Sequence, residues 1–534
     1  MFYRNLFRLF GYILMVPIGI IILLVILGYG AINYNFWPPS CNWLPPIKQA
    51  IRVCEFSKRE KVKIGTPTEI TLWVSIPNIT PASDKIYFVL ENKEPVLMEK
   101  IGELSYQIKM PAVIGQNFGY YYQRNNEKSV SVKKSYSVKM LEPINYDYVF
   151  QWSDQKNEVT LPDRVGVLMF DTWTINYNFN FFEDTRKNLD SSFARLKLLG
   201  AKEVGVFTFI EALGNSYQLD LQEIKSPYKY MRDAAITEKD MKLLAENAKR
   251  NSLDVVIHYN IQADYTKYFK LSDLAMVGQG VGGETAHNKA AMELGVKDDK
   301  TKEWVDMWFD GLTKTLVVWG KRAENNKIYG IDITPQYLSP DLGPDYAYAD
   351  QKYQELILAL RQVYKGKIFA STYSNFGGFK ADFIPKFINE VDGLYVYSTA
   401  IKVAEDSNIS EMKKAFQVQI KASEKLLKDY GKDKFWVFSI GSFDGVTSGK
   451  PSFEFNDYAQ ALAAGNKADW QEQADGYEAM LLALEGNKFF DGVFASGYWY
   501  DDLMDPKYAD PLISMHPSMR NKPAEVVWKK WFRQ

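Results

Sequence analysis

The sequence predicts an α/β protein in which a (β/α)8 barrel follows an N-terminal transmembrane helix and a small immunoglobulin-like β-sandwich. Three observations lead to this fold class: an uncharged apolar segment near the N-terminus, short β-rich segments up to about residue 155, and eight strand–loop–helix units after residue 160. A chain of 534 residues that is 46% hydrophobic and 24% charged can bury a large core, which excludes a disordered or collagen-like protein.

The N-terminal segment predicts where the protein resides. Residues 13–32 form an uncharged apolar run of 20 residues, close to the ~20 that span a bilayer core. Arg4 and Arg8 precede it, so the positive-inside rule keeps the N-terminus in the cytoplasm and sends the following domains across the membrane. A cleaved signal peptide is the alternative, because the small residues within 28–31 suit a processing site. We therefore expect extracytoplasmic domains, anchored at the cell surface or in the periplasm, or secreted after cleavage.

The domain boundaries follow from shifts in composition. We expect a membrane anchor at 1–36, a Pro-rich linker at 37–56, a β-sandwich at 57–155 and a barrel domain at 160–534. The sandwich strands are predicted at 69–76, 85–91, 104–110, 118–124 and 135–141. The barrel strands are predicted at 164–171, 203–210, 254–260, 327–333, 367–372, 391–397, 434–440 and 491–498. Amphipathic helices are predicted between them at 185–200, 237–251, 351–364, 410–431 and 470–486. An open doubly wound sheet is the alternative to a closed barrel.

Charge and metal-ligand content exclude several function classes. The chain has 64 basic and 65 acidic side chains, a formal net charge of -1 and no basic stripe apparent in the sequence, so we expect no nucleic-acid partner. His258, His287, His516, Cys41 and Cys54 offer no zinc-binding spacing, so we expect neither a metal nor another cofactor. The two cysteines either form a local disulfide outside the cytoplasm or stay free.

Candidate functional residues are those at the C-terminal ends of the predicted barrel strands, where barrel enzymes of this kind form their sites. Carboxylates and aromatic rings together suit sugar chemistry, because two acids flank a glycosidic bond and rings stack on the apolar faces of a sugar. The residues in these positions are Asp171, Glu211, His258, Asp332, Tyr373, Tyr397, Ser439 and Trp499, with Trp173 and Asp444 in the adjoining loops.

The barrel region also resembles a known enzyme family. Four segments carry the resemblance, in order and spacing: 308–332 (WFDGLTKTLVVWGKRAENNKIYGID), 470–486 (WQEQADGYEAMLLALEG), 492–502 (GVFASGYWYDD) and 521–532 (NKPAEVVWKKWF). They resemble the retaining TIM-barrel glycoside hydrolases, nearest the mannanase-like enzymes of family 113. The resemblance implies a carbohydrate substrate and, in that clan, a Glu as acid/base at the end of strand 4 and a Glu nucleophile near the end of strand 7.

The sequence departs from that pattern at both positions. Asp332 stands where the clan has its acid/base Glu, and Ser439 stands near the place of the nucleophile. We therefore expect Asp332 to be the acid/base and Glu211, Asp171 or Asp444 to supply the second carboxylate. The alternative for Asp332 is a buried structural acid. The residues expected to contact the sugar are Trp173, His258, Tyr373, Tyr397, Ser439, Asp444 and Trp499.

Two other functions fit the same sequence. A barrel that has lost catalysis could bind glycans with the same rings, and a surface scaffold could use the barrel only to dock partners. The glycan, the linkage and the oligomeric state stay open.

Overall fold

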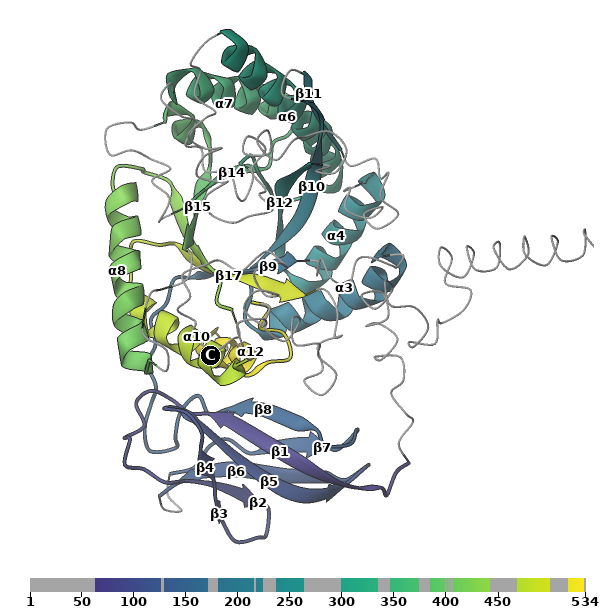
Figure 1. Ribbon diagram of the computed structural model, residues 1–534. Helices are drawn as coiled ribbons and strands as arrows, with labels where there is room; N and C mark the ends of the chain where they lie inside the picture. Colours follow the sequence, from purple (N-terminus) through teal and green to yellow (C-terminus); the bar gives the residue numbers. More distant parts are fainter. Residues whose placement is uncertain are drawn as a thin grey trace, which may run out of the picture.

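The computed structural model (Figure 1) describes the residues in the ranges 63–125, 129–170, 181–215, 218–223, 237–263, 299–334, 346–373, 385–398, 401, 403, 407–441, 468–499 and 517–532. The predicted anchor at 13–32 and the two cysteines lie outside these ranges. Within them, no helix combines the length and the hydropathy that a membrane span requires.

Two four-stranded sheets form the first domain, as the alternating segments predicted. Their strand orders are β4-β5-β1-β8 and β3-β2-β6-β7, and every pairing is antiparallel except β1 with β8. The strands are β1 (Pro67–Ser75), β2 (Ile86–Leu90), β3 (Val96–Leu97), β4 (Glu99–Lys100), β5 (Ser105–Val113), β6 (Asn117–Arg124), β7 (Lys134–Ser137) and β8 (Ile144–Tyr148). The prediction missed β8 and the very short β3 and β4.

The two sheets share one apolar core. Ile70, Leu72 and Val74 alternate along β1 and are fully buried, because successive side chains of a strand point to opposite faces. Phe88 of β2 and Tyr122 of β6 belong to the same cluster. This shared core makes the domain a unit of two packed sheets, while its immunoglobulin-like character stays a prediction.

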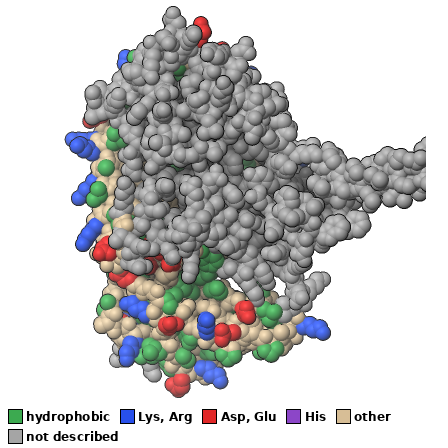
Figure 2. All heavy atoms as spheres, viewed as in Figure 1, with side chains coloured by type: hydrophobic (Ala, Val, Ile, Leu, Met, Phe, Trp, Pro, Cys, Tyr) green, Lys and Arg blue, Asp and Glu red, His purple; other side chains and the backbone are tan. Residues whose placement is uncertain are grey.

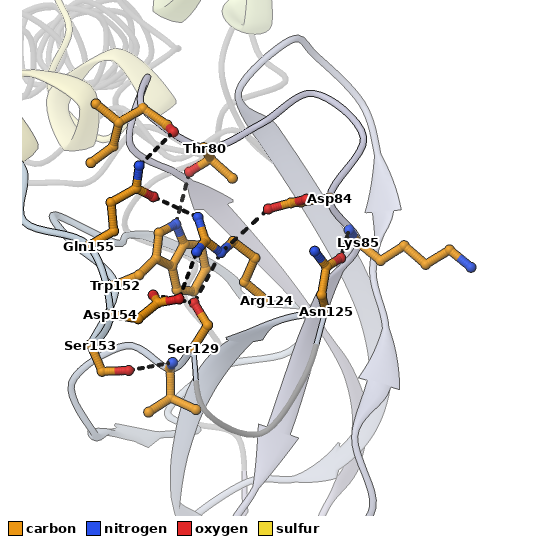
Figure 3. A network of polar contacts seen from close by, with 12 residues as sticks. Thr80, Asp84, Lys85, Arg124, Asn125, Ser129, Trp152, Ser153, Asp154 and Gln155 are labelled. Atoms are coloured by element: carbon orange, nitrogen blue, oxygen red, sulfur yellow. Dashed lines mark hydrogen bonds and ion pairs between the residues drawn. The ribbon is translucent and has the colours of Figure 1, made fainter.

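A polar network ties the segment after β8 to the sandwich (Figure 3). Arg124 at the end of β6 donates to Gln155 (Nη1 to Oε1, 2.6 Å) and to Asp154 (Nη2 to Oδ2, 2.9 Å). Its guanidinium carbon also lies 5.8 Å from the ring centre of Trp152, whose Nε1 donates to Thr80 (2.8 Å). The chain therefore leaves the sandwich toward the barrel along a fixed path.

A closed barrel of parallel strands forms the second domain, which rules out the open doubly wound sheet. The nine-stranded sheet has the order β11-β10-β12-β13-β14-β15-β16-β17-β9, and β9 also pairs with β10, which closes the ring. Strand β11 lies outside the ring and pairs antiparallel with β10. The strands are β9 (Arg164–Phe170), β10 (Glu203–Asn215), β11 (Gln218–Glu223), β12 (Asp254–Ala263), β13 (Gly330–Asp332), β14 (Lys367–Tyr373), β15 (Gly393–Ser398), β16 (Asp433–Phe438) and β17 (Gly492–Trp499).

Helices surround the barrel on the outside (Figure 1). They are α3 (Phe181–Leu198), α4 (Glu238–Asn251), α6 (Asp299–Asn326), α7 (Tyr346–Arg361), α8 (Ile409–Leu427), α10 (Trp470–Leu484) and α12 (Pro523–Phe532), with a 3-10 turn η3 (Lys386–Glu390). Thr237 and Asn408 begin α4 and α8 with capping boxes, in which each side chain accepts a hydrogen bond from the backbone three residues on. The amphipathic pattern had predicted α3, α4, α7, α8 and α10, but not α6 or α12.

Glycines on the barrel strands make room for aromatic rings inside the barrel. A Cβ added to Gly166 of β9 would lie 1.8 Å from Phe494, and one added to Gly330 of β13 would lie 2.4 Å from Phe369. Both phenylalanines are buried in one interior cluster with Tyr395. The barrel interior is thus a packed core and not a channel.

The sandwich and the barrel meet through polar contacts on α10 and α12. Trp73 of β1 donates from Nε1 to Gln471 (2.9 Å), and Gln471 donates to Ser105 of β5 (2.8 Å). Lys530 of α12 forms a buried ion pair with Glu478 of α10 (2.7 Å) and also donates to the end of β1. Because buried polar groups need partners, these contacts depend on both domains being in place.

Candidate functional site

The closed register brings the C-terminal ends of the barrel strands to one mouth. In the sequence, the predicted site residues lie at or near these strand ends. Glu211 lies within β10, Tyr373 ends β14 and Trp499 ends β17, so the structure places their backbones on these strands. Their side chains, and all of Asp171, Trp173 and Asp444, lie outside the described part of the structure. The side chains of His258, Asp332, Tyr397 and Ser439 are described.

Asp332 is the centre of a buried hydrogen-bond network. It is fully buried at the last position of β13. Its Oδ1 accepts from the backbone N of Thr334 (3.0 Å) and from the Thr334 hydroxyl (2.8 Å), while its Oδ2 accepts from the Ser371 hydroxyl and faces Nδ1 of His258 (3.1 Å). Ser371 also donates its backbone N–H to the Thr334 hydroxyl. Both carboxylate oxygens are therefore occupied by protein groups.

This network also closes a weak seam in the barrel. Strands β12 and β13 share only two residue pairs within the described residues, and these end just before His258 and Asp332. Directly beyond, His258 contacts Asp332 across the seam, and the Tyr259 hydroxyl donates to the carbonyl of Ile333 (2.7 Å). Side chains thus replace the backbone ladder where it stops, which gives Asp332 a structural task.

His258 is oriented by this carboxylate. The ring is fully buried, and its centre lies 4.9 Å from that of Tyr395, edge to face. Nδ1 faces Asp332, and the other ring nitrogen, Nε2, has no hydrogen-bond partner among the described residues. A Cβ added to Gly205 would lie 3.0 Å from Nε2, so the imidazole occupies space that only a glycine leaves open.

Below the histidine, an ion pair lies at the N-terminal end of the barrel. Glu203 accepts from the Tyr395 hydroxyl and from Nε of Arg164 (2.7 Å). Burial raises the pKa of Glu203, and Arg164 and Tyr395 only partly offset this. Burial raises the pKa of Tyr395 far above its ordinary value, and the charge of Glu203 adds to this, so the phenol stays a donor. Because this end of such barrels serves stability, we assign these groups to the scaffold.

Tyr397 and Ser439 occupy different levels of the barrel. Tyr397 of β15 is only 4% exposed and belongs to the interior aromatic cluster. Ser439 follows the last residue of β16 and is half-buried. Its placement at a strand end agrees with the sequence analysis, while the replacement of a nucleophile at this position stays a prediction.

Sequence reasoning missed two residues that the structure joins to Asp332. Thr334 lies two residues after Asp332, a spacing at which a carboxylate commonly accepts from the backbone. This local signal could have been recognised. Ser371 lies on the neighbouring strand β14, and only the strand register brings it to Asp332.

The described side chains were also compared with the groupings that bind metal ions. Within the described ranges, no three His, Cys, Asp or Glu side chains gather into a group that could hold a metal ion. The absence of a metal stays a prediction, because several acidic residues of the chain, among them Asp171 and Asp444, lie outside those ranges.

Comparisons with known proteins give a distant structural likeness. No protein-family model and no curated protein matches the sequence. A complex of a family 113 β-1,4-mannanase is 16% identical, with a TM-score of 0.46, over 70% of this chain and 99% of the other. The family 113 β-mannanase of Alicyclobacillus acidocaldarius in complex with ManMIm is 13% identical, with a TM-score of 0.46, over 70% and 98%. The family 5 mannosidase of Rhizomucor miehei is 11% identical, with a TM-score of 0.42, over 70% and 92%. The chain is thus distantly similar in structure to TIM-barrel glycoside hydrolases of families 113 and 5.

Proposed function

We propose that this protein is a membrane-anchored, extracytoplasmic glycoside hydrolase whose site lies at the C-terminal mouth of the barrel. The observation that carries the proposal is convergence: the closed register brings to one mouth the ends of the strands that carry Glu211, Tyr373 and Trp499 and of the strand that Ser439 directly follows. Carboxylates beside aromatic rings are the groups that glycosidic cleavage uses. The substrate class also rests on the sequence motifs that resemble the mannanase-like enzymes.

Within this proposal, Asp332 is a positioning residue. Its two oxygens are held by His258, Thr334 and Ser371, and the side chain is fully buried. To protonate a glycosidic oxygen, the Asp332 carboxyl would have to give up at least one of these hydrogen bonds and leave its buried position to contact the substrate. We therefore assign the acid/base and nucleophile roles to Glu211 and Asp171.

Substitution of these carboxylates tests the proposal. A panel of soluble β-mannans, β-glucans and xylans is incubated with the full-length protein in detergent, and new reducing ends are measured. We expect turnover of at least one glycan, and Glu211→Gln and Asp171→Asn should each lower kcat by about 100-fold or more. Glu223→Gln on the neighbouring strand β11 is the matched control. Full activity in both test variants would remove the assignment.

A glycan-binding barrel without catalysis is the second candidate. The engagement of Asp332 by internal hydrogen bonds favours it, because protein groups bond both oxygens of the one candidate acid whose side chain is described. Glycan binding in affinity gels, without release of reducing ends from any member of the panel, would establish this function in place of hydrolysis.

Membrane anchoring is tested separately. We expect the full-length protein to stay in the membrane fraction after carbonate washing and to enter the soluble fraction once residues 1–36 are deleted. Release of the intact protein by the carbonate wash would contradict the anchor, and an N-terminus beginning near residue 32 would establish a cleaved signal peptide.

A further inference from the structure

Strand β17 carries one extra residue near its C-terminal end, at the mouth of the barrel. Ser496 pairs with Leu168 of β9, but the next pair of the ladder is Tyr498 with Met169. Gly497 has no partner in this described ladder and forms a β-bulge. Its φ of 132° lies in a region that glycine adopts freely and that other residues adopt only under strain.

The bulge exchanges the faces of the last two positions of the strand. Before the bulge, Phe494 lies in the cluster inside the barrel, and Ala495 lies in the core that the strands share with the outer helices. Simple alternation from there would put Tyr498 on the inward face and Trp499 on the outward face. The extra residue shifts the phase by one position, so the backbone gives Tyr498 the outward phase and Trp499 the inward phase.

The side chain of Tyr498 agrees with this exchange. It is fully buried in the core outside the barrel and does not belong to the interior cluster. Its hydroxyl donates to Oε1 of Glu525 on α12 (2.7 Å), and Arg195 of α3 bonds both oxygens of that carboxylate. Because these helices surround the barrel, Tyr498 points outward where simple alternation would turn it inward.

The segment before α12 holds the bulge in place. The backbone N–H of Met519 donates to the carbonyl of Gly497 (3.2 Å), and a Cβ added to Gly497 would lie 3.1 Å from the carbonyl carbon of Pro517. A side chain at this position would have to displace that backbone and also adopt a strained φ. The bulge is therefore a fixed feature of the mouth that requires glycine.

We propose that Gly497 is a positioning residue of the glycan site, because its bulge assigns Trp499, and not Tyr498, to the inward face of the mouth. This inference rests on the proposed function, in which Trp499 contacts the sugar. A ring stacks on a sugar only when it lies on the side where the substrate binds. The bulge thus selects which of two neighbouring aromatic residues faces the substrate, and Gly497 does so through the backbone without contacting the sugar.

Surface charge gives a ligand little guidance by comparison. On the face shown in Figure 2, the described surface of the sandwich carries acidic, basic and hydrophobic side chains interspersed, without a field of one sign. Charge on this surface therefore does not draw a glycan, and its recognition would depend on hydrogen bonds and on rings of fixed direction at the mouth.

Thiol labelling tests the exchange of faces without requiring hydrolysis. Cys41 and Cys54 are replaced by Ser in the full-length protein, and Tyr498→Cys and Trp499→Cys are introduced separately. A small methanethiosulfonate reagent should modify the Trp499→Cys variant at least about tenfold faster, because position 498 is buried against α12. If Tyr498→Cys does not fold, Ala495→Cys is the outward reference. Equal rates, or a slower reaction at position 499, would overturn the proposal.

Changes at Gly497 test whether the bulge is the cause. Deletion of Gly497 restores the alternation, so the order of labelling at positions 498 and 499 should reverse, and an unchanged order would contradict the role of the bulge. If the deletion variant does not fold, Gly497→Ala should lower the ratio of the two rates about threefold or more. Gly486→Ala is the matched control, because Gly486 also has a positive φ (73°) but no heavy atom lies within 4 Å of its added Cβ, so the ratio should stay within about twofold.

Hydrolysis supplies a separate measurement. With the glycan that the wild-type protein cleaves best, Gly497→Ala should raise KM about threefold or more at nearly unchanged kcat, because stacking binds the substrate and the transition state alike. Gly486→Ala should change neither constant. An unchanged KM in Gly497→Ala would overturn the positioning role. Failure to cleave any glycan would instead remove the proposed function, and the labelling rates would still decide whether the bulge assigns the two faces.

Discussion

Replacement of Asp332 by Asn measures how much the barrel depends on this carboxylate. The amide side chain would keep an oxygen for the two bonds from Thr334, but its NH2 group would face Ser371 and His258, which now donate to Oδ2. Two hydrogen bonds to a charged group are thus lost or inverted. At about 1.5 kcal/mol or more each, the expected loss of unfolding free energy is about 3 kcal/mol.

The loss is measured by thermal unfolding of the full-length protein, followed by near-ultraviolet circular dichroism. A change of about 3 kcal/mol corresponds to a fall in Tm of about 6 °C or somewhat more for a domain of about 200 residues, and less for a larger one. Hydrogen exchange should show the loss in β12, β13 and β14, because the network joins these strands.

Ser371→Ala separates the structural from the catalytic role. It removes one bond to Asp332 but leaves the carboxylate, so we expect about half of the destabilisation of Asp332→Asn. If Asp332→Asn leaves the Tm unchanged and abolishes activity, while Ser371→Ala has no effect on either, the positioning role is wrong and Asp332 is the acid/base.

Three further predictions concern the scaffold. Burial, together with the charges of Glu478 and Glu103, raises the pKa of Asp475 to about 7. Because the folded state holds the Asp475 proton more tightly than the unfolded state does, protonated Asp475 stabilises the fold. This stabilisation is complete below the unfolded pKa and is lost as pH rises from about 4 to 7, by at most about 4 kcal/mol. Urea midpoints should therefore fall less over this range in Asp475→Asn than in the wild type, and an equal pH dependence of the two would contradict the assignment. Lys530→Met should lower the unfolding free energy by about 3 kcal/mol or more, because Glu478 loses its buried partner. Adding Glu478→Leu should recover part of this loss in a double-mutant cycle, and no recovery would argue against the ion pair. Gly166→Ala should cost about 1–3 kcal/mol because the new Cβ meets Phe494, and Phe494→Leu should relieve it; additive losses in calorimetry would show that the ring is not the obstacle.

The strands were predictable because each carries a local signal. Most barrel strands read as apolar runs bounded by turns, and their observed limits differ from the predicted ones by a few residues. The exceptions have physical reasons: β13 is only three residues long because its ladder to β12 stops early, and β10 continues into a hairpin with β11. Helix α6 carries the same kind of signal as the predicted helices, because Asp310, Lys314 and Lys321 are exposed on one side while Trp308 and Trp319 are buried on the other, so it was predictable from the sequence.

The candidate site was predictable only in part. Position at a strand end is a local property, so Asp332 and His258 could be named from the sequence. Their contact depends on the register between β12 and β13, and the participation of Ser371 depends on β14, which are properties of the assembled barrel. The sequence therefore supplied the residues but not the bonds that define the task of Asp332.

The rate of glycan cleavage by the Glu211→Gln variant tests the central claim most directly. With the glycan that the wild-type protein cleaves best, we expect kcat to fall by about 100-fold or more while the Tm and the affinity for that glycan stay near their wild-type values. Wild-type turnover by this variant, or no cleavage of any glycan by the unaltered protein, would contradict a hydrolytic site at the barrel mouth.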